Sequence, residues 1–574
     1  MGKENVTKVN PFEGIGLCFS GGGYRATFYT LGILSYLHRL SFKGKPLLQQ
    51  VSALSSVSGG TLTAVAFAKM VREQKTDFGT FFKKFYDTFT PDNDTLLETA
   101  VKNLESDGVW EANPHKTRSL INAFALTYSG MEVFEGSFSL FNDSTLKPLK
   151  QVCFNATDFS FGLPYRFQNS GDFGNNPLGN PLVEALSPKI QLGDVIASSS
   201  CFPLGFEPML FPDDYFKDQN DPNYKNLKKL QRFEDGVGIM DGGIADNQGI
   251  GSMMLISGRM KRMGEPLNLI IVNDVGSFKM EKWEQDNSFT KKGPSLKKFL
   301  AKMLSYFKIK FLYILIFVLG LLLVILNALH IFKTCDQCDS PVFYIVGSIL
   351  MGIGLVLMLL GGLASLGMAY AKGKIARLFK KNVPEVLLDD VLTFKKLDIG
   401  LVQQMLINRL TSTVKMVNDV FMKQMRRLNY DLFYSKDELK YKRVTTTVYE
   451  LNGQETPYSG GTPSYNQNIK PSPSQLLKDV CLIASETPTT LWWDKKDIAA
   501  DRMDTLIACG QFSLCYKLME YILELKGSKE ADAKEHCDKF EIDLTHLDQL
   551  EQQLQSDWKA FNKDPFFYLK ELKA

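Results

Sequence analysis

Histidine is scarce in this chain, and neither sign of charge dominates it. The 574 residues include five histidines, and none stands in a loop after a predicted strand, where the base of a Ser-His-Asp triad is expected. Lys and Arg number 66 against 63 Asp and Glu, which gives a net charge of +3. This balance gives no global reason to expect a nucleic-acid partner, so any electrostatic partner must be recognised locally.

Other familiar signals are also absent. The first residues contain no apolar stretch, so we expect no secretory signal, and Val6 stands where myristoylation requires Ser or Thr. Among nine cysteines only Cys335 and Cys338 form a C-x-x-C pair, which is too few ligands for a tetrahedral zinc site. We therefore expect neither a metal nor an organic cofactor.

Two long apolar runs, residues 311–332 and 342–369, stand in the middle of the chain. Neither run contains Asp, Glu, Lys or Arg, and each reaches the roughly 20 residues that a helix needs to cross a bilayer. The alternative is a pair of buried core helices. The pattern favours a transmembrane hairpin with a short polar loop at 333–341.

Basic residues flank the hairpin on both sides, whereas its loop contains only Lys333. The positive-inside rule therefore predicts a two-span membrane protein whose termini are both cytoplasmic. Small residues recur at four-residue spacing in the second run and predict a face for close packing, either within the hairpin or in a homo-oligomer. The basic residues are Lys291, Lys292, Lys297, Lys298, Lys302, Lys308, Lys310, Lys372, Lys374, Arg377, Lys380 and Lys381, and the small ones are Ser348, Gly352, Gly361, Ser365 and Ala369.

Residues 1–290 read as an α/β domain. Short apolar strands are predicted at 15–19, 51–54, 152–155 and 269–273, and they alternate with helical or irregular segments. That order is typical of a mostly parallel sheet covered by helices. Residues 76–165 are rich in Phe and Tyr, which predicts either a cap over a lipid site or ordinary core.

The remaining segments differ in composition. Residues 291–310 form a basic amphipathic segment, read either as an interfacial helix on anionic lipid or as a continuation of the first span. Residues 311–370 are the hairpin, and 371–526 are a mainly helical continuation with one strand predicted at 442–451. Residues 527–574 form a charged helical tail whose apolar face contains Leu544, Leu547, Leu550 and Leu554.

The first candidate motif is the run from Ser20 to Ala26, Ser-Gly-Gly-Gly-Tyr-Arg-Ala, between a predicted strand and a predicted helix. Three consecutive glycines allow backbone N–H groups to converge, and the following helix adds its positive end, so the turn can hold an anion. The spacings of a P-loop and of a dinucleotide fingerprint are both absent.

The second motif, Ser56-Val57-Ser58-Gly59-Gly60, also joins a predicted strand to a helix. A serine in such a tight turn is typical of a nucleophile elbow, in which small neighbours permit strained dihedrals. Ser56 replaces the first glycine of G-x-S-x-G.

The third motif starts at Asp241, which two glycines follow after an apolar segment. Taken alone this is more often an ordinary turn. Together, the three motifs supply a nucleophile, a base and oxyanion donors, which is the set that acyl transfer needs. A Ser–Asp dyad would explain why no suitable histidine is present.

These motifs resemble, in type and order, those of the patatin-like phospholipases and the related cytosolic phospholipases of the A type. The segment from Ile196 to Pro208 also resembles that family's Ala-Ser-Ser…Pro segment, and residues 485–518 resemble its ending more faintly. The resemblance implies a patatin-like three-layer fold with a helical C-terminal extension. The hairpin is then either inserted into the catalytic domain or a joint between that domain and the extension.

The resemblance further implies Ser58 as nucleophile, Asp241 as base, and the N–H groups of Gly21, Gly22 and Gly23 as the oxyanion hole. Arg25 matches the family's arginine, which implies binding of an anionic substrate group. The expected activity is hydrolysis of membrane phospholipid or another lipid ester through an acyl-enzyme. The alternative is a catalytically silent membrane scaffold on the same fold, and a transporter is disfavoured because the spans lack charged residues.

Overall fold

The computed structural model divides the chain into two compact units, which are described separately. One unit contains residues 1–281 and 417–574, and the other contains residues 282–416. The described residues are 9–142, 149–175, 180–203, 205–276, 283–285, 310–329, 341–382, 398–454, 465–527 and 546–574, with 295, 298, 302, 331, 333–335, 338–339, 535 and 543.

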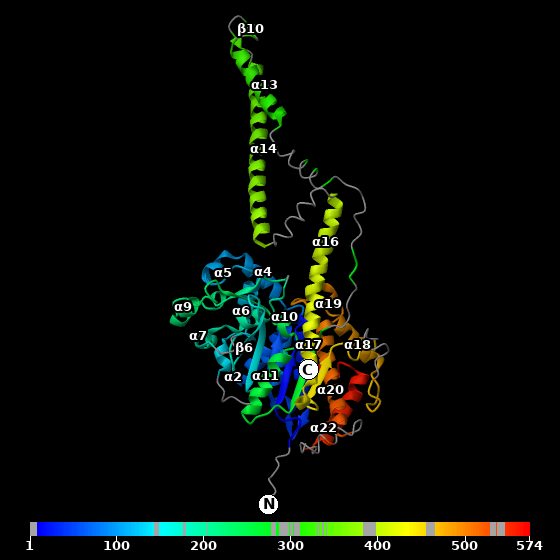
Figure 1. Ribbon diagram of the computed structural model, residues 1–574. Helices are drawn as coiled ribbons and strands as arrows, with labels where there is room; N and C mark the ends of the chain where they lie inside the picture. The colour runs from blue at the N-terminus through cyan, green and yellow to red at the C-terminus, as the bar shows by residue number, and fades with distance from the viewer. Residues whose placement is uncertain are drawn as a thin grey trace, which may run out of the picture. The chain divides into compact units, whose positions relative to one another are not determined.

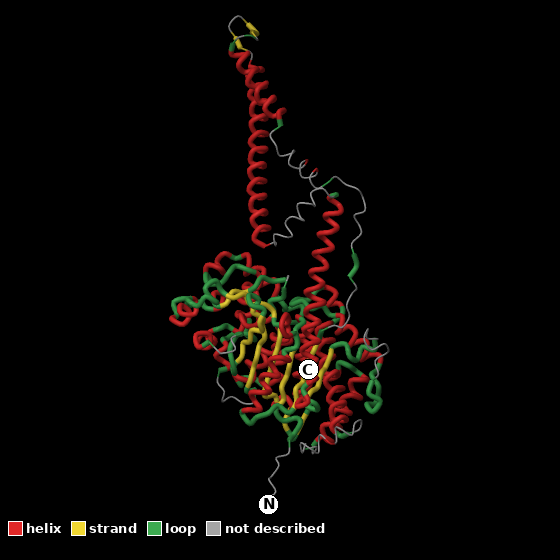
Figure 2. Tube along the Cα trace, in the orientation of Figure 1, coloured by secondary structure: helices red, strands yellow, loops and turns green. Residues whose placement is uncertain are grey.

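A mixed sheet forms the centre of the larger unit (Figures 1 and 2). In spatial order its strands are β12 (Arg443–Thr447), β9 (Leu269–Asp274), β1 (Ile15–Phe19), β4 (Val51–Val57), β5 (Gln151–Asp158), β8 (Val237–Asp241) and β7 (Met209–Phe211), and β6 (Leu163–Gln168) also pairs with β5. The first five are parallel, whereas β6 and β8 run antiparallel to β5. The four strands predicted in residues 1–290 and the one predicted at 442–451 all belong to this sheet.

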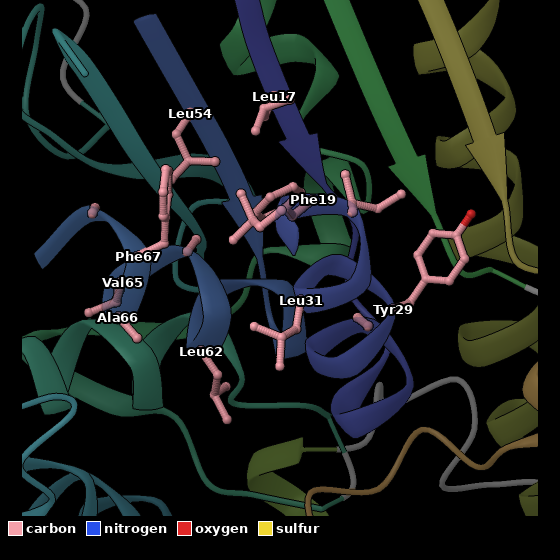
Figure 3. Close-up of a cluster of buried hydrophobic side chains, with 14 of the residues drawn as sticks. Leu17, Phe19, Tyr29, Leu31, Leu54, Leu62, Val65, Ala66 and Phe67 are labelled. Carbon is pink, nitrogen blue, oxygen red and sulfur yellow. The ribbon is translucent and has the colours of Figure 1, made fainter. Parts of the chain in front are cut away.

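Alternate side chains of the strands enter two different cores, because successive residues of a strand point to opposite faces. Leu17 and Phe19 of β1 join the larger core, with Leu54 of β4, against α1 (Gly23–Arg39), α2 (Gly59–Glu73) and α20 (Arg502–Leu525). Figure 3 shows part of this cluster. Cys18 joins the second core, with Met253 of α11 (Ile250–Arg262). Helices therefore cover both faces, which confirms the three-layer α/β/α fold.

The Phe and Tyr residues between 76 and 165 are mostly core. Phe82, Phe85, Phe124, Phe138 and Phe141 are all buried in the larger cluster. The segment is helical over much of its length, in α3 (Phe78–Thr88), α4 (Leu96–Glu105), α5 (Asp107–Ala112) and α6 (Leu120–Gly130). The core interpretation, rather than the cap, describes these residues.

Helices beyond the sheet complete this unit. They are α7 (Pro181–Leu186), α8 (Leu192–Ser199), α9 (Pro222–Lys228), α10 (Gly243–Asp246), α17 (Met422–Ser435), α18 (Gln475–Glu486), α19 (Lys495–Ala499), α22 (Leu547–Lys563) and α23 (Phe567–Lys573), and the short strands β2 (Ser41–Phe42) and β3 (Lys45–Pro46) form a hairpin. Leu547, Leu550 and Leu554 of α22 are fully buried, which confirms the apolar face of the tail for these three, while Leu544 is outside the described residues.

The smaller unit contains both apolar helices, α13 (Phe311–Ala328) and α14 (Pro341–Asn382), with α16 (Ile399–Lys415) and a two-stranded turn of β10 (Lys333–Cys335) and β11 (Cys338–Asp339). By length and composition, Phe311–Ala328 and Pro341–Leu363 could each cross a membrane, and only 11% of each window is buried. Of the predicted interfacial segment 291–310, only residues 295, 298, 302 and 310 are described.

Glycines bring α13 and α14 together. A Cβ at Gly320 would lie 2.6 Å from the Gly347 carbonyl oxygen, and one at Gly354 would lie 2.7 Å from the Phe317 nitrogen. Ser348 and Gly352, by contrast, are exposed, and a Cβ at Gly352 would meet nothing within 4 Å. The hairpin therefore packs through Gly347 and Gly354 rather than through the predicted Ser348–Gly352 face.

Candidate active site

Strand register brings the second and third motifs together at the middle of β5. β6 occupies one edge of β5 from Cys153 to Asp158. β4 and β8 must therefore share the other edge, since a strand has two. β4 ends with Val57 beside Asn155, and β8 ends with Asp241 beside Ala156, the next residue along β5. The two strands run towards each other and end at adjacent positions.

Ser58 occupies the tight turn between β4 and α2. Its backbone has φ 50° and ψ −126°, a strained conformation for a residue with a side chain. A Cβ at Gly59 would lie 2.0 Å from the Gly23 carbonyl oxygen, and one at Gly60 would lie 2.6 Å from that of Ser20. No larger residue fits after Ser58, so the two glycines allow the Gly-rich loop to approach the turn.

Hydrogen bonds from Ser199 hold this turn. The Ser199 hydroxyl accepts the Ser58 N–H at 2.9 Å and donates to the Asn155 carbonyl at 2.7 Å. It also lies 2.8 Å from the hydroxyl of Thr61, which in turn lies 3.0 Å from that of Ser56. The serine that replaces the first glycine of G-x-S-x-G is therefore buried with a hydrogen-bond partner.

Asp241 lies beside Ser58 with its side chain almost fully buried. Burial raises the pKa of its carboxyl to about 6, while hydrogen bonds from the Gly243 N–H and the Ser58 hydroxyl act in the opposite direction. The Gly243 N–H donates to Oδ1 at 2.6 Å. The Asp241 N–H donates to the Cys201 carbonyl at 3.0 Å, which ties Asp241 to the segment after α8. A carboxylate with this pKa is ionised at neutral pH and still accepts a proton readily.

The three glycines of the first motif lie next to Ser58 but differ in their hydrogen bonding. A Cβ at Gly21 would lie 3.2 Å from that of Ser58, and the Gly21 N–H already donates to the Asn247 carbonyl at 2.8 Å. Among the described residues, no acceptor engages the N–H of Gly22 or Gly23. Both have positive φ, 149° and 54°. Two of the three predicted donors are therefore free for an anion.

The C-terminal part of the chain closes against this loop. The Tyr24 N–H donates to the Thr490 carbonyl at 2.8 Å, and a Cβ at Gly23 would lie only 2.2 Å from the Thr489 carbonyl oxygen. Residues 485–490 thus complete the surroundings of the Gly-rich loop, although more than 400 residues separate them in sequence.

Arg25 is 8% exposed and lies on α1, directly after this loop. Its Nη1 donates to the Ser485 carbonyl at 3.2 Å, whereas its Nε is buried and has no hydrogen-bond partner. Burial lowers its pKa to about 10, an effect that Asp274 opposes and Arg426 reinforces. Among the hydrogen bonds of the described residues, none joins Arg25 to Ser58 or Asp241, so Arg25 does not position either residue by a hydrogen bond.

Helix α17 contributes neighbours that the sequence did not reveal. Met422 Cε lies 3.4 Å from the position that a Cβ at Gly243 would take, next to Asp241. Asn429 donates to Asp246 Oδ1 at 3.2 Å, and Arg426 Nε donates to Asp274 Oδ2 at 2.8 Å. The first bond fixes α17 against the segment that follows Asp241, and the second fixes it against the end of β9. Ser199 lay within a recognisable segment, but no local pattern marked Met422 or Arg426.

One known family matches the part of the chain that contains these motifs. The family model described as "Patatin-like phospholipase" matches residues 17–254. These residues form a patatin-like phospholipase domain. The matched range contains all three motifs, whereas β9, β12 and α17 of the same compact unit lie outside it.

Among solved structures, human GIVD cytosolic phospholipase A2 is similar at 14% identity and a TM-score of 0.27. The similarity covers 46% of this chain and 43% of that one, so the chain spans less than half of this relative. No curated protein sequence matches the chain.

Proposed function

We propose that this protein is a membrane-anchored lipid acyl hydrolase that cleaves carboxylic esters with Ser58 as nucleophile and Asp241 as base. The observation that carries the proposal is that Ser58, at a strained strand-to-helix turn, directly follows β4 where that strand meets the end of β8, which carries the buried Asp241. The match of residues 17–254 to the patatin-like family supports it and favours a phospholipid or another lipid ester as substrate.

In the first half of the reaction, Asp241 accepts the hydroxyl proton while Ser58 Oγ attacks the ester carbonyl carbon. The carbonyl oxygen becomes an oxyanion, to which the N–H groups of Gly22 and Gly23 donate. Asp241 then returns the proton to the alcohol oxygen as the ester C–O bond breaks. The alcohol leaves, and the acyl group stays on Ser58 as an ester.

Water completes the cycle by the same route. Asp241 accepts a proton from water, whose oxygen attacks the acyl carbon, and the proton then passes to Ser58 Oγ as the fatty acid departs. Gly21 contributes by its position, because its N–H is held by Asn247. Arg25 has an unpartnered, buried Nε, which suits it to attract an anionic part of the substrate towards the loop.

Membrane anchoring belongs to the same proposal. The helices α13 and α14 are long and apolar enough to span a bilayer, and basic residues flank both. We propose that residues 1–290 and the C-terminal segments are on the cytoplasmic side, with residues 333–341 outside. The exposed Ser348 and Gly352 offer a surface for a homo-oligomer.

Fatty-acid release from vesicles containing the purified full-length protein tests the activity. Wild type should release fatty acid, and Ser58→Ala should reduce the rate by about three orders of magnitude or more. Ser52→Ala is the matched control, because Ser52 lies on the same strand, β4, near its opposite end. Equal rates for Ser58→Ala and wild type would refute the assignment, and no release by wild type would favour a silent scaffold.

A further inference from the structure

The turn between β5 and β6 exposes apolar side chains. Phe159 is 57% exposed, Phe161 54% and Leu163 42%, in contrast to the buried phenylalanines of residues 76–141. Leu230, in the segment after α9, is also 42% exposed. We call Phe159, Phe161 and Leu163 the hairpin tip. Leu230 adjoins it, because Arg232, two residues further on, lies over the Phe161 ring. Exposure of four large apolar side chains in two nearby segments is costly in water unless a partner covers them.

Strand register places the hairpin tip at the end of the sheet where Ser58 and Asp241 lie. Asp241 is level with Ala156 of β5, and β5 continues to Asp158, which pairs with Leu163 of β6. Phe159 therefore lies three residues beyond the level of Asp241, about 10 Å at the usual rise of a strand. The tip therefore projects beyond the candidate dyad, and it does not lie at the opposite end of the strands.

The tip is held in shape by its neighbours. The Gly162 N–H closes the turn on the Asp158 carbonyl at 2.8 Å, and the Phe159 N–H donates to the Gly238 carbonyl of β8 at 2.8 Å. The Gly238 N–H donates in return to Ser160 Oγ at 2.9 Å. The turn is therefore anchored to β8, the strand that carries Asp241, so its exposed side chains are presented on a fixed support.

A cation lies beside the apolar side chains. The Arg232 guanidinium is 4.8 Å from the centre of the Phe161 ring and donates to the buried Asp158 carboxylate at 3.1 Å. Exposed Glu234 and Asp235 follow close by, so the region is not strongly basic. Aromatic rings with an adjacent arginine suit the zone between lipid headgroups and acyl chains, where one part of the surface is apolar and the next is polar.

We propose that the hairpin tip inserts into the surface of the lipid bilayer and thereby brings the dyad to its substrate. This inference rests on the proposed function, because a lipid must pass from the bilayer to Ser58. The partner that covers the tip is a bilayer rather than a protein. The tip lies at the end of the sheet where a lipid substrate has to arrive, and the chain contains two helices suited to a bilayer. Insertion of side chains beyond Ser58 shortens the path of the lipid through water.

Tryptophan quenching tests insertion without relying on catalysis. The full-length Phe161→Trp variant is placed in vesicles whose lipids carry bromine on their acyl chains, and its fluorescence is compared with that of wild type. Met263→Trp is the matched control. Met263 is 64% exposed and lies beside Gln151, the first residue of β5, at the opposite end of this strand from the tip. Bromolipid should remove most of the emission that the Phe161→Trp change adds and little of that added by Met263→Trp. Equal quenching of the two overturns the proposal.

Catalysis on two substrates tests the consequence. Phe159→Ser combined with Phe161→Ser should reduce fatty-acid release from the bilayer about tenfold, while hydrolysis of a short-chain soluble ester and labelling by a fluorophosphonate stay within twofold of wild type. Met263→Ser should change neither rate. An unchanged bilayer rate overturns the proposal, as does an equal loss on both substrates. Self-association that the double variant abolishes would assign the tip to a second copy of the chain.

The two proposals can fail separately. If Ser58→Ala retains activity while the added emission of Phe161→Trp is quenched, the proposed dyad is wrong and the membrane contact stands. If Ser58→Ala is inactive while Phe161→Trp and its control are quenched equally, the hydrolase assignment stands and the membrane contact is wrong.

Discussion

Asp241→Asn should inactivate the enzyme and at the same time stabilise the fold at neutral pH. The change is nearly isosteric: the new Oδ1 can still accept the Gly243 N–H, and the new amide can donate to Ser58 Oγ. Asn cannot accept the hydroxyl proton, so kcat should fall by about three orders of magnitude or more. The variant also removes a buried charge, and this sets the direction of the stability change.

The magnitude follows from the pKa of Asp241. Burial raises that pKa from 3.8 to about 6, which corresponds to about 3 kcal/mol at 1.36 kcal/mol per pKa unit. Because the folded state binds this proton more tightly than the unfolded state, the free energy of unfolding falls as pH rises from about 4 to about 6. Above pH 6 the full cost of the buried carboxylate is present, whereas the Asn variant never has it.

Urea unfolding of the larger unit, followed by pulse proteolysis of the full-length protein in detergent, measures this difference. The free energy of unfolding of Asp241→Asn minus that of wild type should grow by about 2 to 3 kcal/mol between pH 4 and pH 7 and then level off. Asp274→Asn is the control, because it breaks the buried ion pair with Arg426 and should destabilise by about 3 to 5 kcal/mol at pH 7. A difference for Asp241→Asn that stays flat or shrinks with rising pH would refute the reasoning.

Two further substitutions and one labelling experiment probe the site and the topology. Gly23→Ala should abolish activity, because φ is 54° and the added Cβ would lie 2.2 Å from the Thr489 carbonyl oxygen; a variant with wild-type kcat would contradict the tight fit. Ser199→Ala should lower kcat about 10- to 100-fold and slow fluorophosphonate labelling in proportion, because it removes the acceptor of the Ser58 N–H. An unchanged labelling rate would show that the turn keeps its conformation without this hydrogen bond. A membrane-impermeant maleimide, applied to intact cells after mild reduction, should modify Cys335 and Cys338 but not Cys18; modification only after lysis would reverse the topology.

Local patterns predicted the elements of the fold well because each rests on neighbouring residues. The apolar run at 15–19 coincides with β1, and the run at 269–273 is one residue shorter than β9. The strand predicted at 51–54 extends to Val57, because Ser55 and Ser56 are buried between β1 and β5 although they are polar. A search for hydrophobic patterns therefore misses the part of a buried strand whose residues are polar.

The site depended more on contacts between distant segments. Ser58 and Asp241 each follow a strand, so turn chemistry could single them out, but their meeting depends on β4 and β8 sharing one edge of β5. The Gly21 N–H was expected to face an oxyanion, and the structure shows it bound to the Asn247 carbonyl. No spacing in the sequence predicts that pairing. The same holds for Met422 and for the Thr490 carbonyl, which reach the site from beyond the apolar helices.

Identification of the residue that a fluorophosphonate modifies tests the central claim most directly. The full-length protein, reacted at pH 7.5 and digested, should carry the adduct on the peptide that contains Ser58, and the adduct should vanish in Ser58→Ala and form far more slowly in Asp241→Asn. Labelling at pH 5 should be about tenfold slower than at pH 7.5, because a base with a pKa of about 6 is then mostly protonated. An adduct on another serine, or full labelling of Ser58→Ala, would contradict the account.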